Sequence, residues 1–145
     1  MKTQLAVAIT SLMGFTALAD LPPKFVRAIH MVESSGRYGK IDGDNFRAKG
    51  PLQIHESYYR DAKAFKPSIG GTYNDCYNFD YSVKVMTAYM ERYGMKYIQK
   101  GNWEALARLH NQGVGWEKNP AKTDAYCLKF RKEYNKLRVS GIAKN

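Results

Sequence analysis

Cysteines, acidic residues and long apolar segments are all scarce in this 145-residue chain. It has only two cysteines and no Cys-x-x-Cys or His-x-x-x-His spacing, which excludes the common structural zinc sites. No uncharged segment is long enough to span a bilayer, so we expect no stable membrane insertion. Zinc-finger, P-loop and RNA-recognition signatures are also missing, which argues against the familiar nucleic-acid-binding classes.

The shortage of acidic residues leaves the chain strongly basic. Lysine and arginine total 23 against 13 aspartate and glutamate, for a formal net charge of +10. This charge implies an anionic partner: nucleic acid, an anionic membrane, or an acidic polymer such as a bacterial wall. Hydrophobic residues at 44% and charged residues at 25% are globular proportions, so we expect a folded domain.

The start of the chain has the features of a secretory signal peptide. Met1 and Lys2 form a short positive start, the stretch from Leu5 to Ala19 carries no charge, and the stretch ends in an Ala-x-Ala cleavage pattern. The alternative is a buried N-terminal helix. We expect residues 1–19 to be removed, residues 20–145 to form the domain, and the protein to be secreted and extracellular. Secretion argues for the bacterial wall and against nucleic acid.

The two cysteines are Cys76 and Cys127, both in the expected mature chain. In an oxidising compartment one disulfide between them is the default expectation. Closing the intervening loop would contribute on the order of 4 kcal/mol in the chain-entropy model. A catalytic thiol is the alternative, but neither cysteine lies in a nucleophile motif.

The hydrophobic pattern predicts a single, mainly helical domain, because no repeat or linker divides the chain. Phe25, Ile29 and Val32 recur at helical spacing, and this first helix should end near Gly36. The glycine-rich polar stretch that follows predicts a short β-hairpin or irregular β-like loop within residues 37–54.

Four further helices follow from the same pattern. We expect a second helix over residues 56–65, a third from Phe79 to a stop at Gly94, a fourth from Trp103 to Gly113, and a last one that opens at Pro120. The predicted fold class is therefore mainly α (α+β), with one small β element.

Glu33 is the first candidate for chemistry, because it stands at the end of the first predicted helix. The negative end of the helix dipole and partial burial both favour the protonated carboxyl. A carboxyl that holds its proton is what glycosidic cleavage needs as a general acid. The alternative is a solvated glutamate at a helix end. His30 lies one turn earlier, but no third ligand is in register, so we expect no metal.

Asp42 and Asp44 are candidates for a second carboxylate. They follow Glu33 across the glycine-rich reversal, so a hairpin that folds back on the helix brings one of them opposite it. Retaining glycosidases hold their two carboxyls about 5–5.5 Å apart and inverting ones about 6.5–9.5 Å apart. Ordinary turn chemistry is the alternative for both residues, since turns select aspartate before glycine.

Several segments, taken in order, resemble the invertebrate-type (destabilase) lysozymes and, more broadly, the lysozyme and lytic-transglycosylase superfamily. The resemblance covers about residues 29–134. It is carried by Val32-Glu33-Ser34 with Gly36, Gly50-Pro51-Leu52-Gln53-Ile54, Glu56-Ser57-Tyr58-Tyr59-Arg60-Asp61, Ala88-Tyr89-Met90-Glu91-Arg92-Tyr93 and Ala107-Arg108-Leu109-His110-Asn111-Gln112-Gly113.

The resemblance implies a lysozyme-like helical domain with a small β-hairpin that flanks the cleft. It implies Glu33 as the acid and Asp44, or else Asp42, as the second carboxylate. It also places four residues along the sugar groove: Gln53, Tyr89, His110 and Asn111. The family is usually rich in cysteine, whereas this chain has a single candidate disulfide. Some members of the family also cleave isopeptide bonds, but no residues here match that activity securely, so we do not infer it for this chain.

The sequence therefore predicts a secreted, antibacterial muramidase that hydrolyses the β-1,4 glycosidic bonds of peptidoglycan. Glu33 would be the general acid and Asp44 the stabiliser or nucleophile. We expect no cofactor and a monomer. One alternative is a lytic transglycosylase that uses Glu33 alone, and another is a cationic wall-binding protein without catalysis.

Overall fold

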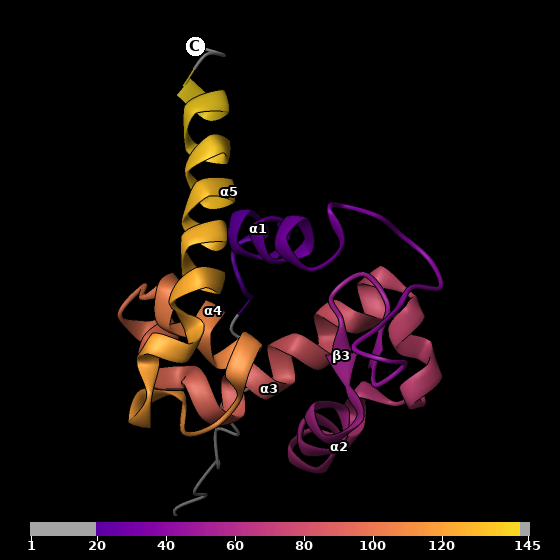
Figure 1. Ribbon diagram of the computed structural model, residues 1–145. Helices are drawn as coiled ribbons and strands as arrows, with labels where there is room; N and C mark the ends of the chain where they lie inside the picture. The colour runs from indigo at the N-terminus through magenta and orange to yellow at the C-terminus, as the bar shows by residue number, and fades with distance from the viewer. Residues whose placement is uncertain (1–19, 143–145) are drawn as a thin grey trace, which may run out of the picture.

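The computed structural model describes residues 20–142 of the chain (Figure 1). The predicted fold class is confirmed: five α-helices accompany one small antiparallel sheet in this part of the chain. The helices are α1 (Pro23–Ser34), α2 (Glu56–Phe65), α3 (Phe79–Gln99), α4 (Trp103–Gln112) and α5 (Asp124–Ile142). Short 3-10 turns join them: η1 (Pro67–Ile69), η2 (Tyr73–Tyr77), η3 (Trp116–Lys118) and η4 (Pro120–Thr123). The expected signal peptide, residues 1–19, lies outside the described residues.

The sheet has three strands of two residues each, one strand more than the predicted hairpin. Strands β1 (Asp42–Gly43), β2 (Ala48–Lys49) and β3 (Ile54–His55) lie in that order and are antiparallel. Gly43 pairs with Ala48, and Lys49 pairs with Ile54. The third strand runs directly into α2, so the sheet and that helix form one unit.

Helix α1 ends abruptly, which fixes its last turn. Ser35 adopts the left-handed conformation with φ of 56°, and its N–H donates to the carbonyl of Met31. The N–H of Gly36 reaches back to the carbonyl of His30 at 3.3 Å. This pattern of returning N–H groups is a common helix C-cap. Glu33 consequently lies in the final turn of a rigid helix, as the sequence predicts.

Helix α3 continues past Gly94, so the predicted stop there is wrong. Gly94 is buried, and a Cβ built on it would lie 2.5 Å from Leu106 Cδ2 and 3.0 Å from Leu109 Cδ2. Its missing side chain lets α3 and α4 approach closely. The helix ends instead at Gln99, ahead of Gly101, whose φ is 62°.

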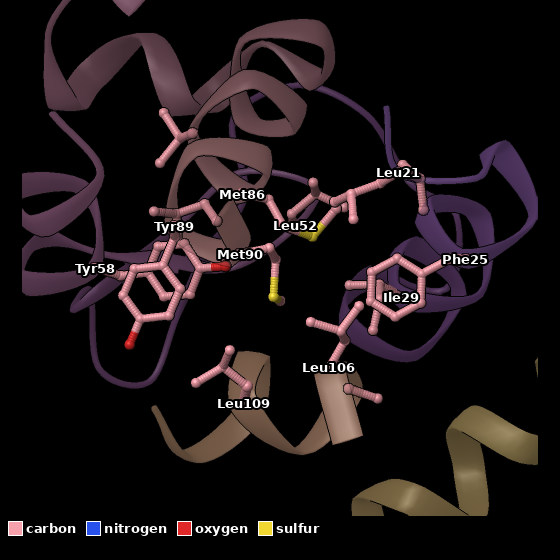
Figure 2. Packing of buried hydrophobic residues seen from close by; sticks show 14 of the residues in the cluster. Leu21, Phe25, Ile29, Leu52, Tyr58, Met86, Tyr89, Met90, Leu106 and Leu109 are labelled. Carbon is pink, nitrogen blue, oxygen red and sulfur yellow. The ribbon is translucent and has the colours of Figure 1, made fainter. Parts of the chain in front are cut away.

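The hydrophobic core lies where α1, α3 and α4 meet. Phe25 and Ile29 from α1 face Met90 from α3 and Leu106 from α4, and all four are fully buried (Figure 2). Helix α5 lies against α1, and its C-terminal part extends beyond the rest of the molecule (Figure 1). None of the helices between residues 20 and 142 combines the length and the apolar character that crossing a bilayer requires.

The expected Cys76–Cys127 disulfide is absent, and both thiols are free and buried. The two residues sit in separate surroundings. Cys76 belongs to η2, which packs on β2 and α3, whereas the Sγ of Cys127 on α5 donates to the Glu104 carbonyl at 3.8 Å. Burial raises the pKa of Cys76 to about 12 and that of Cys127 to about 11. Both are therefore thiols near neutral pH, packed as small apolar side chains.

Gly50 lets the sheet pack closely against η2. Its φ is 75°, a left-handed value, and a Cβ built on it would lie 1.8 Å from the carbonyl oxygen of Cys76. Its N–H donates to the carbonyl of Ile41 at 2.7 Å. Both the conformation and the close approach require glycine at this position.

Glu104 joins α4 to α5 through two arginines. Arg131 forms a bidentate salt bridge with the Glu104 carboxylate at 2.7 and 2.8 Å, and Arg108 lies 3.3 Å from the same carboxylate. The hydrogen bonds from Arg131 and Arg108 lower the pKa of Glu104 from 4.5 to about 2. The ionised carboxylate therefore favours the folded state.

We expect Gly50→Ala to lower the free energy of unfolding by about 2–5 kcal/mol, because backbone strain and a collision with η2 add together. Gly39→Ala is the matched control. Gly39 also has positive φ, at 90°, but nothing lies within 4 Å of a Cβ built there. It should cost only about 1–2 kcal/mol. Urea unfolding followed by circular dichroism measures both, and equal losses would contradict the proposed contact.

We expect Glu104→Gln to destabilise the protein by about 1 kcal/mol at pH 7. Since the folded-state pKa lies below the unfolded one, the contribution of this carboxylate is present above pH 4.5 and is lost as the pH falls toward about 2. Urea unfolding of wild type and variant between pH 7 and pH 2 should show the two curves converging. Glu133→Gln, which removes a single pair with the exposed Lys136 within α5, should change little at any pH.

Candidate functional site

The carboxyl of Glu33 is enclosed by side chains from two other helices. The hydroxyl of Tyr126, on α5, donates to Glu33 Oε1 at 2.6 Å. His110 Nε2, on α4, lies 3.4 Å from the same oxygen. The Glu33 side chain is only 16% exposed. Position 33 therefore lies in a packed polar junction and not on an open surface.

His110 connects Glu33 to the segment between β2 and α2. Its Nε2 lies 3.1 Å from the carbonyl of Leu52, and its Nδ1 lies 3.2 Å from the hydroxyl of Tyr58. These contacts are satisfied together when Nε2 carries the proton, donating toward Leu52 and Glu33, and Nδ1 accepts from Tyr58. The imidazole is buried. The network consequently fixes the Glu33 carboxyl from the sheet side as well as from α5.

Two tyrosines in the network act as hydrogen-bond donors. Burial raises the pKa of Tyr126 well above its usual range, and the charge of Glu33 adds to the shift. Burial also raises the pKa of Tyr58, with smaller contributions from Tyr89 and Glu33. Both phenols therefore keep their protons at neutral pH, so Tyr126 can donate to Glu33 and Tyr58 to His110.

A pocket of about 270 Å³ opens beside this network. It is lined by His55, Ser57, Tyr58, Asp61, Tyr89, His110, Asn111, Gln112 and Gly113. The rings of Tyr58 and Tyr89 stack at 3.6 Å between centroids and form an aromatic wall (Figure 2). The structure thus brings Tyr89, His110 and Asn111 to one pocket. Glu33 is not among the residues that line this pocket, and it is linked to the pocket by its contact with His110.

Gln53 lies away from that lining and supports the sheet instead. Its backbone is left-handed, with φ of 50°, and its side-chain amide donates to the Gly50 carbonyl at 2.8 Å. A Cβ built on Gly43 would lie 1.7 Å from Gln53 Oε1, so the side chain packs directly on β1. Its contacts within the described chain are those of a residue that shapes the turn.

Both candidate aspartates belong to the sheet and have partners of their own. Asp44 lies in the β1–β2 turn, where its carboxylate pairs with Arg47 at 2.9 Å and with His55 at 3.5 Å. Asp42, in β1, accepts a hydrogen bond from the hydroxyl of Tyr77. Asp44 is 46% exposed at the side chain. Local pairing therefore satisfies each carboxylate, and neither partner set includes Glu33.

The sequence interpretation missed the roles of Tyr58 and Tyr126. Tyr126 is separated from Glu33 by 93 positions, and its periodicity marks it only as one face of a helix. No local pattern shows that its hydroxyl meets a carboxyl. His30 is engaged elsewhere, since its Nε2 lies 2.7 Å from the Arg37 carbonyl and its ring packs on Phe79. Over residues 20–142, no group of three His, Cys, Asp or Glu side chains is placed to hold a metal ion.

No protein-family model matches the chain, and comparison with curated proteins and with solved structures gives no significant similarity. The chemistry of the site has to be argued from its own geometry. That geometry is a mostly buried carboxyl with two converging donors, one of which, His110, lines a pocket.

We expect Tyr126→Phe to lower the free energy of unfolding by about 1–2 kcal/mol, because it removes a donor from a carboxyl that is mostly buried. Tyr134→Phe on the same helix is the control, since the Tyr134 ring packs on Phe130 and under Lys24 and the phenylalanine keeps that packing. Urea unfolding midpoints compare the two. Equal effects would show that the hydroxyl of Tyr126 contributes nothing specific.

Proposed function

We propose that the protein is a secreted muramidase, which cleaves the β-1,4 glycosidic bonds of bacterial peptidoglycan with Glu33 as the general acid. The observation that carries the proposal is the enclosure of Glu33 by Tyr126 and His110 beside a pocket. A carboxyl shielded from water and aimed by neighbouring donors suits proton transfer to a glycosidic oxygen.

The two oxygens of the Glu33 carboxyl have different roles in the proposed reaction. Tyr126 and His110 both approach Oε1, which acts as their acceptor. In the proposed reaction Oε2 then carries the proton that passes to the leaving sugar oxygen as the C–O bond breaks. Water attacks the resulting oxocarbenium-like centre and gives one proton to the Glu33 carboxylate, so the new hydroxyl completes a reducing end and the acid is regenerated. Asp44 would stabilise that centre or attack it.

Two further features support the proposed substrate. The motifs that resemble invertebrate-type lysozymes supply Glu33 and the pocket residues Tyr89, His110 and Asn111. The formal net charge of +10 favours encounter with the anionic polymers of a bacterial wall. The pocket lining combines the rings of Tyr58 and Tyr89, which are buried and stacked on each other, with polar groups that suit the hydroxyls of a sugar.

A lytic transglycosylase is the second candidate, and the position of Asp44 favours it. That carboxylate is already paired with Arg47 and His55 in the β1–β2 turn. With Glu33 alone, a hydroxyl of the substrate itself attacks the anomeric carbon, and the product is an anhydro sugar lighter by one water. Comparison of Asp44→Asn with Asp42→Asn separates the two candidates. Muramidase chemistry with Asp44 requires loss of activity in the first variant and not in the second.

We expect Glu33→Gln to reduce the clearing of bacterial wall suspensions by about 100- to 10,000-fold, because the amide keeps the shape of the side chain but cannot donate the proton. Its Oε1 can still accept from Tyr126, so folding should be preserved. Turbidity of purified walls measures the rate, and circular dichroism confirms the fold.

The matched control is Glu133→Gln, which makes the same chemical change on α5, where Glu133 pairs with Lys136. It should clear walls at the wild-type rate. Unchanged clearing by Glu33→Gln would contradict the assignment of the acid. A cationic wall-binding protein without catalysis would differ in another way, because it would not clear purified walls and both of its variants would keep the antibacterial effect of the wild type.

A further inference from the structure

Phe46 stands at the tip of the β1–β2 turn and is 80% exposed, more than the other large apolar side chains of the described chain that are exposed. Exposure of a whole aromatic ring is unfavourable unless the ring meets a partner. Its neighbours along the chain, Asn45 and Arg47, are polar and also exposed. The Phe46 ring is therefore an exposed apolar surface flanked along the chain by polar residues.

The backbone at the tip is held in an unusual conformation. Asp44, Asn45 and Phe46 follow one another with φ of 48°, 55° and 67°, all in the left-handed region that non-glycine residues seldom adopt. Consecutive residues of this kind persist only where the surrounding structure imposes them, and they gather at functional positions. The exposure of Phe46 is consequently imposed by its backbone.

Contacts on both sides of the turn impose that conformation. Arg47 donates to the side chain of Asp44 at 2.9 Å and to its carbonyl at 3.1 Å, and His55 of β3 lies 3.5 Å from the same carboxylate. The hydroxyl of Tyr73 lies within hydrogen-bonding distance of the carbonyls of Arg47 and Ile54. These contacts hold the turn against β3 and η2. The Phe46 ring is therefore held in a fixed position.

Phe46 lines a second pocket that adjoins the one beside Glu33. This pocket has a volume of about 320 Å³ and is lined by Phe46, Arg47, His55, Glu56, Ser57 and Tyr73. His55 and Ser57 also line the pocket that contains His110 and Asn111. Because the two pockets share these two lining residues, they lie next to each other.

We propose that Phe46 stacks on a sugar ring of the glycan strand and extends the binding site beyond the sugars next to Glu33. A pyranose has an apolar C–H face and a rim of hydroxyls. The Phe46 ring offers the apolar face a partner, while Arg47, Glu56 and Ser57 offer the hydroxyls donors and acceptors. This inference rests on the proposed function, because it takes the occupant to be the same polysaccharide.

The test measures binding to insoluble peptidoglycan by co-sedimentation, with Glu33→Gln as the parent so that the glycan stays intact. We expect Phe46→Ala to raise the dissociation constant about threefold to tenfold, and Phe46→Trp to restore binding, since stacking needs an aromatic face. Phe65→Ala is the matched control. Phe65 is an exposed phenylalanine at the end of α2 that lines neither pocket, and its loss should leave binding unchanged.

Kinetics of the same substitutions in the wild-type background add a second readout. Phe46→Ala should raise KM on long glycan strands and leave kcat near the wild-type value, because Phe46 is not among the side chains that contact the Glu33 carboxyl. Equal binding by Phe46→Ala and its parent would overturn the inference, and so would binding by Phe46→Trp as weak as that of Phe46→Ala.

Failure of the proposed function gives a different result. In that case Glu33→Gln clears walls as fast as the wild-type protein, whatever the Phe46 variants do. If Glu33→Gln is inactive and Phe46→Ala binds normally, the acid assignment stands and the stacking inference alone is rejected. Circular dichroism of each variant confirms that the turn substitution leaves the fold intact.

Discussion

The structure depends on one polar junction inside an otherwise apolar interface. Glu33 from α1, His110 from α4 and Tyr126 from α5 meet at a single carboxyl oxygen, and Leu52 and Tyr58 tie His110 to the sheet side. A buried polar group without partners would cost free energy, so these segments have to meet in register for the core around Phe25, Met90 and Leu106 to close. The same requirement gives Glu33 a defined orientation. Positioning of this kind is what a general acid needs before a substrate arrives.

The elements around the junction supply rigidity by packing and hydrogen bonding. Glycine at position 94 lets α3 and α4 approach closely, and Gly50 lets the sheet pack closely against η2. Glu104 joins α4 to α5 through Arg131 and Arg108, which holds the helix carrying His110 beside the helix carrying Tyr126. Cys76 and Cys127 are free buried thiols. These contacts therefore provide the rigidity that the sequence analysis expects from a disulfide. The two glycines and the ion pair thus hold together the elements that carry the partners of the candidate acid.

Local sequence was sufficient for most of the helices and for the position of Glu33. The pattern over residues 56–65 predicts the bounds of α2 as the structure has them, and the break after Ser34 predicts the end of α1. Gly94 was misread because a glycine that permits close helix packing has the same local appearance as one that ends a helix. The partners of Glu33 could not be predicted, since a contact across 93 positions leaves no trace in periodicity. Asp44 and Gln53 show the same limit. Their residue types suggest chemistry, whereas their contacts with Arg47, His55 and Gly50 depend on how the turn folds.

We place the chemistry at Glu33 and the substrate contacts in the two adjoining pockets that include Asn111 and Phe46. The central proposal is that a glycosidic bond is broken there. The most direct measurement is mass spectrometry of the fragments that the wild-type protein releases from purified peptidoglycan. We expect disaccharide-based fragments cut between sugars, with reducing ends from hydrolysis or with anhydro ends from transglycosylation. Release of peptides from intact glycan strands, or no soluble fragments at all, would contradict the proposed cleavage.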